Sequence, residues 1–345
     1  MTQKFRFSLL ASAVLLLNAC SKDEPFTEIK LAEGTKTAEM GSDYANQVYF
    51  DLSEGTAVVR PANSWDLAFQ SSGGTAVRSN FAKKTGVYAV TTDFTSTTQV
   101  PATGLRYDDI SLDLTKTAVG DWQGKTYVIN LGLNPPTSAV SLGFKKFRVE
   151  GFSNGKYTLR YANLDGTEDK TVEIPVNTKT NFTYFSLINS TVVDVEPEKG
   201  KWDIVATGIT QPGGGPPGSY VVSVGFLTNR FENVQVAVHN PAADLAASDL
   251  PTAPINNVAS SESKYDVLTK ADFQTLSPTT DAAVIGKSWW QILQPHAQAN
   301  YKVYDWKTYM IQDAEGRVYK MKFLTFKGGP DITSGYPSFQ YNELQ

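Results

Sequence analysis

A Trp-Asp stretch occurs twice in this chain, and this repetition constrains the fold more than any other feature. PANSWDLAFQ spans residues 61–70, and EKGKWDIVAT spans residues 198–207. In the first copy, Trp65, Leu67 and Phe69 recur at every second position, so we expect them to share one face of a half-buried β-strand. Long helical patterns are hard to find, while Gly, Pro, Thr, Asn and Ser recur every few residues. We predict an all-β protein built from antiparallel sheets.

Three further landmarks recur in the same order as the Trp-Asp stretch. They are YFDL at 49–52 with YFSL at 184–187, AVGDWQ at 118–123 with VIGKSWWQ at 284–291, and the hairpin-like FRVEGFSNGKYTLRY at 147–161 with YMIQDAEGRVYKMKF at 309–323. Four landmarks in one order favour a duplication, because chance alternation explains one match but rarely four. We predict two tandem related β units, at 41–175 and 176–345, with Trp65 and Trp202 in equivalent core positions. A single sandwich or barrel made from both halves is the alternative.

The N-terminus is typical of a bacterial secretory signal. A basic start precedes an apolar run from Leu9 to Leu17, which is too short to span a bilayer permanently. The run ends in LNAC, which resembles the lipobox of lipoproteins, where the cysteine becomes the lipidated first residue of the mature chain. We predict a signal peptide at 1–19, followed by the lipidated Cys20 and a tether at 20–40. The SKDE that follows Cys20 resembles the export tag of surface-displayed lipoproteins, although a solvated linker explains it equally well.

Composition excludes several classes of partner and site. Cys20 is the only cysteine, so the mature chain has neither an intramolecular disulfide nor a cysteine-based zinc site. Without the two basic residues of the signal peptide, 29 basic residues (31 − 2) face 35 acidic ones. A chain with this charge and no basic stripe is not expected to bind nucleic acid.

Motifs of catalysis are missing from the sequence. It has no GxSxG, HExxH or GxxxxGK[ST] pattern, and GGGPPG at 213–218 lacks the lysine of a phosphate loop. The carboxylates are scattered, and neither histidine has a serine or aspartate placed nearby to complete a triad. We therefore predict a protein that is not an enzyme and has no catalytic residues.

The only two histidines, His239 and His296, both lie in the second unit. Val234, Val236 and Val238 are expected to share one strand face, which places His239 on the opposite face. His296 follows Trp289-Trp290. Two imidazoles near flat aromatic side chains suit a non-covalent porphyrin site, but two ordinary surface histidines fit the same pattern.

The order of these motifs resembles that of the HmuY family of haem-binding lipoproteins. YFDLSEGTAVV with WDLAF, KWDIVATG with VVSVGFLTN, then VIGKSWW, TYMIQDAEGRVYKMKFLTF and GYPSFQYNEL carry the resemblance, which is strongest from residue 284 to the C-terminus. It implies an outer-membrane, cell-surface protein that acquires haem, free or from haem-carrying proteins, and passes it to a TonB-dependent receptor.

The resemblance also implies two axial ligands to the haem iron, histidines in some members and methionines in others. His296 falls in the loop where one family histidine ligand lies, whereas His239 does not fall cleanly on the other position. Met310 and Met321 are the fallback ligands, and Met321 alternates with Tyr319 and Phe323 as a core residue would. No other metal site is expected. The competing hypothesis is a surface β-scaffold without cofactor that binds glycan or protein through exposed aromatic residues, for which a solvent-facing Trp289–Trp290 pair would be the sign.

Overall fold

A computed structural model gives the fold of residues 28–30, 34–213, 216, 218–241, 263–292 and 301–345. In these ranges the chain is almost entirely antiparallel β-structure, which confirms the all-β prediction. The short helical elements are α1 (Asp272–Thr275), η1 (Leu114–Lys116) and η2 (Arg230–Glu232). None of the helices in these ranges has the length and apolar character that crossing a membrane requires.

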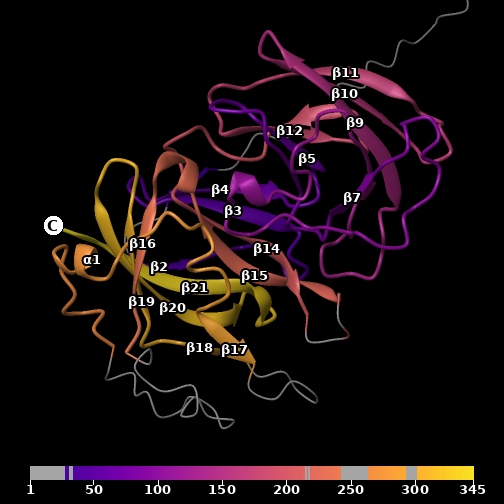
Figure 1. Cartoon of the computed structure of the whole chain (residues 1–345). Coiled ribbons are helices and arrows are strands. Elements are labelled where there is room, and N and C mark those ends of the chain that lie inside the picture. Colours follow the sequence, from indigo (N-terminus) through magenta and orange to yellow (C-terminus); the bar gives the residue numbers. More distant parts are fainter. Residues whose placement is uncertain (1–27, 31–33, 214–215, 217, 242–262, 293–300) are drawn as a thin grey trace, which may run out of the picture.

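Four larger sheets and one hairpin make up the fold (Figure 1). Sheet I has the order β11-β10-β9-β8-β7, from β7 (Gly86–Val90), β8 (Thr126–Asn130), β9 (Phe144–Ser153), β10 (Lys156–Ala162) and β11 (Lys170–Pro175). Sheet II has the order β13-β12-β5-β6, from β5 (Leu67–Gln70), β6 (Val77–Ser79), β12 (Phe182–Ser186) and β13 (Thr191–Val193).

Sheets III and IV are the other two of the larger sheets. Sheet III has the order β1-β4-β3-β14-β15, from β1 (Glu28–Lys30), β3 (Asn46–Asp51), β4 (Thr56–Pro61), β14 (Ile204–Pro212) and β15 (Tyr220–Thr228). Sheet IV has the order β16-β19-β20-β21-β2, from β2 (Gly34–Thr37), β16 (Gln235–His239), β19 (Thr308–Gln312), β20 (Val318–Gly328) and β21 (Thr333–Leu344). A separate hairpin joins β17 (Trp290–Ile292) to β18 (Tyr301–Val303).

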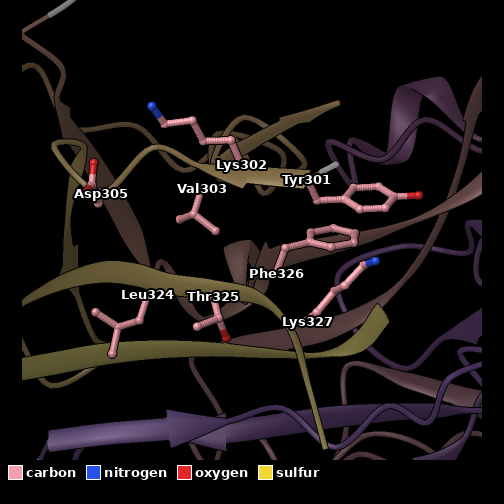
Figure 2. A pocket seen from close by; sticks show the side chains of 8 residues that line it. All are labelled: Tyr301, Lys302, Val303, Asp305, Leu324, Thr325, Phe326 and Lys327. Atoms are coloured by element: carbon pink, nitrogen blue, oxygen red, sulfur yellow. The ribbon is translucent and has the colours of Figure 1, made fainter. Parts of the chain in front are cut away.

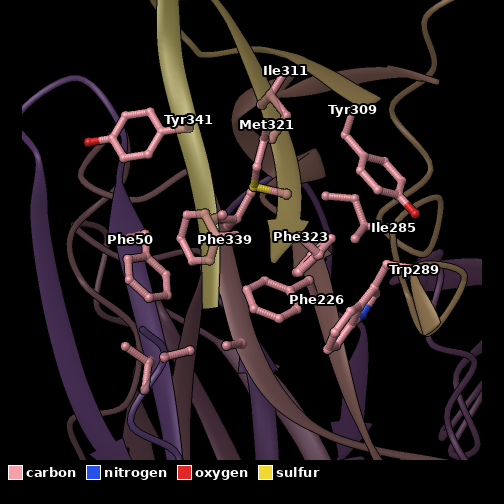
Figure 3. Close-up of a cluster of buried hydrophobic side chains, with 14 of the residues drawn as sticks. Phe50, Phe226, Ile285, Trp289, Tyr309, Ile311, Met321, Phe323, Phe339 and Tyr341 are labelled. Atoms are coloured by element: carbon pink, nitrogen blue, oxygen red, sulfur yellow. The ribbon is translucent and has the colours of Figure 1, made fainter. Parts of the chain in front are cut away.

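Three apolar clusters hold the sheets together in the order I, II, III, IV. Leu67 and Phe69 of β5 pack toward sheet I, while Ala68 between them belongs to the cluster shared with sheet III. The third cluster lies between sheets III and IV; Figure 3 shows Phe50 and Phe226 meeting Phe339 and its neighbours there. Sheets II and III are therefore covered on both faces, which is why eight of the nine residues of β14 are buried.

Trp65 and Trp202 fill equivalent places in the central cluster between sheets II and III. They are 2 % and 4 % exposed, so the prediction that both are core residues is confirmed. The predicted face of Trp65 was wrong, however, because β5 begins only at Leu67 and Trp65 points away from the cluster that holds Leu67 and Phe69. Each indole meets a tyrosine edge to face, Tyr184 at 4.9 Å for Trp65 and Tyr49 at 5.1 Å for Trp202.

The two halves of the chain exchange their first hairpins. Strand β3, from the first half, pairs with β14 of the second, and Phe50 lies opposite Ile204. Strand β12, from the second half, pairs with β5 of the first, and Phe185 lies opposite Leu67. Sheets II and III therefore each contain strands from both sides of the predicted boundary at 175/176. The predicted units at 41–175 and 176–345 are thus interleaved in space.

The aspartate of each Trp-Asp stretch anchors the hairpin that comes from the other half. Asp66 accepts a hydrogen bond from the backbone N–H of Leu187 at 2.7 Å, and Asp203 accepts one from Leu52 at 2.8 Å. The N–H of each aspartate donates in turn to the residue two positions earlier in the same hairpin. This reciprocal contact explains why the chain repeats Asp after Trp, because each carboxylate holds the exchanged hairpin in place.

Strand pairing corrects one of the repeated landmarks. In sheet I, Tyr127 of β8 lies opposite Phe147 of β9, which lies opposite Tyr161 of β10. In sheet IV the same pattern is made by Tyr309 of β19, Met321 of β20 and Tyr341 of β21. The hairpin at 147–161 therefore corresponds to β20–β21 and not to 309–323, so the predicted match was displaced by one strand.

The predicted tether extends too far toward the fold. Residues 34–37 form β2, which pairs with β21 at the edge of sheet IV. Ala38 and Met40 are fully buried in the cluster between sheets III and IV. Alternating buried residues and strand pairing place 34–40 inside the fold, whereas the predicted signal peptide at 1–19 and Cys20 lie outside the described residues.

Candidate functional site

The second half carries a hairpin that has no counterpart in the first. The indole N–H of Trp122 donates to the carbonyl of Thr75 at 2.8 Å, and that of Trp290 donates to Val224 at 3.4 Å. Strand pairing sets Val77 of β6 in the place of Phe226 of β15. Thr75 and Val224 each lie two residues before these positions, which supports the predicted match of the two tryptophans. Two residues separate Trp122 from Lys125, but sixteen separate Trp290 from Lys307. Strands β17 and β18 lie in this insertion.

The base of the inserted hairpin is aromatic. Tyr301 of β18 stacks on Phe326 of β20, with ring centroids 4.2 Å apart and planes 7° from parallel. Trp290 lies 4.6 Å from the same phenylalanine ring. Tyr301 and Trp290 are half-buried whereas Phe326 is buried, so the hairpin covers Phe326 and leaves an aromatic edge at the surface. Figure 2 shows Tyr301 and Phe326 lying face to face at one end of a groove.

His296 falls between the ends of β17 and β18 in the sequence and lies outside the described residues. Its position relative to His239 is therefore a prediction that the structure does not address. The structure places the two strands that flank it: β17, which ends at Ile292, and β18, which begins at Tyr301.

His239 ends β16 at the edge of sheet IV, opposite Thr308 of β19. Val234, Val236 and Val238 pack into the cluster between sheets III and IV, so His239 lies on the outer face, as its alternation predicts. The side chain is half-buried. Its Nδ1 and the Oγ1 of the fully buried Thr308 are enclosed and have no hydrogen-bond partner within the part of the chain that the structure describes. Two unsatisfied polar atoms on facing residues are unusual in a native protein.

Electrostatics keep His239 neutral. Burial lowers the pKa of its imidazole, and the nearby Lys264 lowers that pKa further, against an opposing effect of Asp272. Because the ordinary imidazole pKa is already about 6.5, a lowered value leaves the ring uncharged at neutral pH. The uncharged imidazole is the form that binds a metal ion.

The two fallback methionines are buried in different places. Met321 is fully buried between sheets III and IV, and Figure 3 shows its sulfur beside Phe339. Met310 is also fully buried, on the outer face of sheet IV, where Ala237, Leu268 and Phe273 cover it. Neither thioether reaches the surface, so coordination by either one requires the surrounding core to repack.

The first half has neither the histidine nor the inserted hairpin at the equivalent positions. Val87 of β7 pairs with Ile129 as Val236 of β16 pairs with Ile311, which sets Val90 in the place of His239. The hairpin of the second half is replaced by a short turn after Trp122. Among the described residues of both halves, no group of three or more His, Cys, Asp or Glu side chains is arranged to hold a metal ion.

The stacked rings of Tyr301 and Phe326, and Lys327 beside them, were not predicted from the sequence. A signal was available for the hairpin, because WQI at 290–292 and YKV at 301–303 alternate. Phe326 gave no such signal, since it lies three residues after Phe323, where an irregularity in the pairing of β20 interrupts the alternation. The alternation shows that these residues form strands, but only the fold shows that β18 lies over β20.

Comparisons with known proteins agree with the motif order. A family model described as HmuY protein matches residues 43–172 and 178–341. The chain is similar to the crystal structure of the Tannerella forsythia apo HmuY analog (TFO), with 10 % identity, 92 % of this chain and 97 % of that chain covered, and a TM-score of 0.23. It is also similar to a putative lipoprotein from Bacteroides fragilis NCTC 9343, with 12 % identity, 56 % and 91 % covered, and a TM-score of 0.21. These TM-scores are too low for the superpositions to support an argument. No curated protein matches the chain.

Proposed function

The chain belongs to the HmuY family, a family of haem-binding lipoproteins, and from this premise we propose that it binds haem at the cell surface without catalysis. In this proposal it takes haem, free or from haem-carrying proteins, and passes it to a TonB-dependent outer-membrane receptor. The lipobox at Cys20 supports attachment to the outer membrane through a lipid.

The observation that carries the proposal is the state of His239. It is half-buried and neutral, and it stands in the half of the protein that alone carries the aromatic hairpin. Haem supplies an iron whose axial positions accept imidazole nitrogen and a flat apolar ring that aromatic side chains cover. Among the described residues, His239 fits an axial ligand, while Met310 and Met321 do not fit without repacking. We propose His296 as the second ligand, since it stands in the segment between β17 and β18.

Haem titration of the purified mature chain tests this function. We expect a Soret band distinct from that of free haem, which weakens in His239→Ala and in His296→Ala and is lost in the double variant. Met321→Leu is the matched control, because it preserves the core volume and leaves both histidines in place. A spectrum identical to that of free haem would refute haem binding, and an unchanged band in the double variant would refute ligation by these histidines.

A solvent-facing Trp289–Trp290 pair would have favoured the alternative, a scaffold that binds glycan or protein through exposed aromatic residues. Trp289 is fully buried, with its ring 4.1 Å from Phe323 and nearly parallel to it. Trp290 is half-buried. The pair therefore does not form a solvent-facing platform.

A further inference from the structure

A groove opens between the inserted hairpin and sheet IV. It has a volume of about 410 Å³ and is lined by Tyr301, Lys302, Val303, Asp305, Leu324, Thr325, Phe326 and Lys327. Both walls come from the second half, one from β18 and one from β20. A volume in this range holds part of a flat ligand of porphyrin size, with the remainder outside the groove.

One end of the groove combines a flat wall with a positive charge. The stacked rings of Tyr301 and Phe326 form the wall, and the Nζ of Lys327 lies 5.3 Å from the centroid of Tyr301. Figure 2 shows the Lys327 side chain alongside Phe326 at this end, while Asp305 lies at the other end. Lys327 is exposed, so its ammonium can turn toward an anion without leaving a buried site.

The second lysine of the groove points elsewhere. Figure 2 shows Lys302 rising from β18 on the side opposite Val303, as alternation along a strand requires. Its Nζ lies 5.8 Å from the ring centroid of Trp306. Lys302 therefore lines the same groove and carries the same charge as Lys327, but it lies on β18 and points away from the stacked rings, which makes it a matched control.

The corresponding groove of the first half has no lysine among its lining residues. Strand register, including a shared irregularity, places Glu150 at the position of Leu324 and Phe152 at that of Phe326. These residues and Trp122 line a cavity of about 370 Å³ that no hairpin covers. Glu150 is paired with Arg148, whose Nε lies 3.3 Å from its carboxylate. The same register places Ser153 where the second half has Lys327, so the first half offers no ammonium to an anionic ligand at this position.

We propose that the groove between β18 and β20 receives a carboxylate-bearing edge of the porphyrin, with the Lys327 ammonium as its ion-pair partner and the Tyr301–Phe326 stack as its flat wall. This inference rests on the haem-binding function proposed above and adds to it a site for the propionate side chains. Recognition here involves the carboxylates and the ring face and does not involve the iron.

Binding of haem and of haem dimethyl ester, whose carboxylates are blocked, tests this site in the mature chain. We expect Lys327→Gln to weaken haem binding about threefold, the loss typical of one exposed ion pair. The same substitution should leave binding of the dimethyl ester unchanged, and Lys302→Gln should change neither. Iron-free protoporphyrin, followed by its own fluorescence anisotropy, reports the groove without axial ligation.

The possible outcomes distinguish a failure of the groove proposal from a failure of the haem-binding proposal. If Lys327→Gln binds haem as the unchanged protein does, the groove proposal is wrong and haem binding stands. A similar, about threefold weakening of protoporphyrin binding in Lys327→Gln supports the groove even if the histidine variants show that axial ligation is wrong. If the unchanged chain binds neither haem nor protoporphyrin, both proposals fail.

Discussion

Asp66 and Asp203 occupy equivalent positions, and we predict that replacing each by asparagine changes stability in opposite directions. Both accept a backbone N–H from the exchanged hairpin. Asp66 also accepts a bond from the Nζ of the fully buried Lys83 at 2.6 Å, which balances its charge. Asp203 forms no ion pair within the described residues, and burial raises the pKa of its carboxyl from 3.8 to about 7.

The expected changes in the free energy of unfolding depend on whether each buried charge is left without a partner or is removed. Asp66→Asn leaves the ammonium of Lys83 buried without a partner, which costs about 3–5 kcal/mol. Asp203→Asn keeps an oxygen for the N–H of Leu52 and removes a carboxylate that is costly to ionise. Each pKa unit corresponds to about 1.4 kcal/mol, so the difference between 3.8 and about 7 corresponds to about 4 kcal/mol.

The pH dependence of the free energy of unfolding shows in which direction Asp203→Asn changes stability. The folded-state pKa of Asp203 is raised, so its contribution to stability is complete below pH 3.8 and is lost as the pH rises toward about 7. Asp203→Asn should therefore match the unchanged protein near pH 4 and exceed its free energy of unfolding by up to about 4 kcal/mol at pH 7 and above.

Urea unfolding at pH 4 to 8, read as the midpoint with an unchanged m-value, measures both variants. Asp66→Asn should unfold at a lower urea concentration at neutral pH, and Asp203→Asn at a higher one. If both variants lose several kcal/mol at pH 7, the reasoning from charge compensation is wrong and the hydrogen bond to the exchanged hairpin dominates instead.

Three further predictions concern the hairpin, a buried acid and the methionines. Replacing residues 291–306 by the Gln-Gly that follows Trp122 should leave the β circular dichroism spectrum intact and abolish haem binding; retained binding would show that the site lies elsewhere. Burial raises the pKa of Glu196 to about 8, so this group loses its stabilising contribution between pH 4.5 and about 8, and Glu196→Gln should be more stable than the unchanged protein above pH 8 in urea unfolding. Met321→Ala should lower the free energy of unfolding by about 2–5 kcal/mol, and Met321→Leu by less than about 1.5 kcal/mol with the same haem spectrum; a changed spectrum in Met321→Leu would indicate ligation by its sulfur.

Local patterns were sufficient to predict the fold class. Alternation in KYTLRY predicts a strand, and Tyr157, Leu159 and Tyr161 are indeed buried in one cluster. The same reasoning placed His239 on the outer face of β16, because Val234, Val236 and Val238 recur at every second residue and define the inner face. A period of two residues is a property of the strand itself, so it can be read before any partner is known.

Alternation also caused the errors. Strands β9–β10 and β19–β20 look alike in sequence because both alternate around a glycine turn, yet β9–β10 corresponds to β20–β21. Trp65 was likewise assigned to the face of Leu67 and Phe69 because it continues their alternation, although β5 begins only at Leu67. Sequence alternation gives the face of a residue only where the chain is already a strand.

The sequence by itself predicted that a β unit is repeated and that Trp65 and Trp202 are core residues, and it places both histidines after residue 176. Only the tertiary structure decided that the hairpins are exchanged, because alternation along β3 does not specify its partner strand, and that partner is β14. It also decided that an aromatic groove with Lys327 forms under the inserted hairpin, since β18 and β20 meet through packing rather than through neighbouring sequence. The repeated Trp-Asp thus indicates which strands exist, and the contacts of its carboxylate with the other half determine how they are joined.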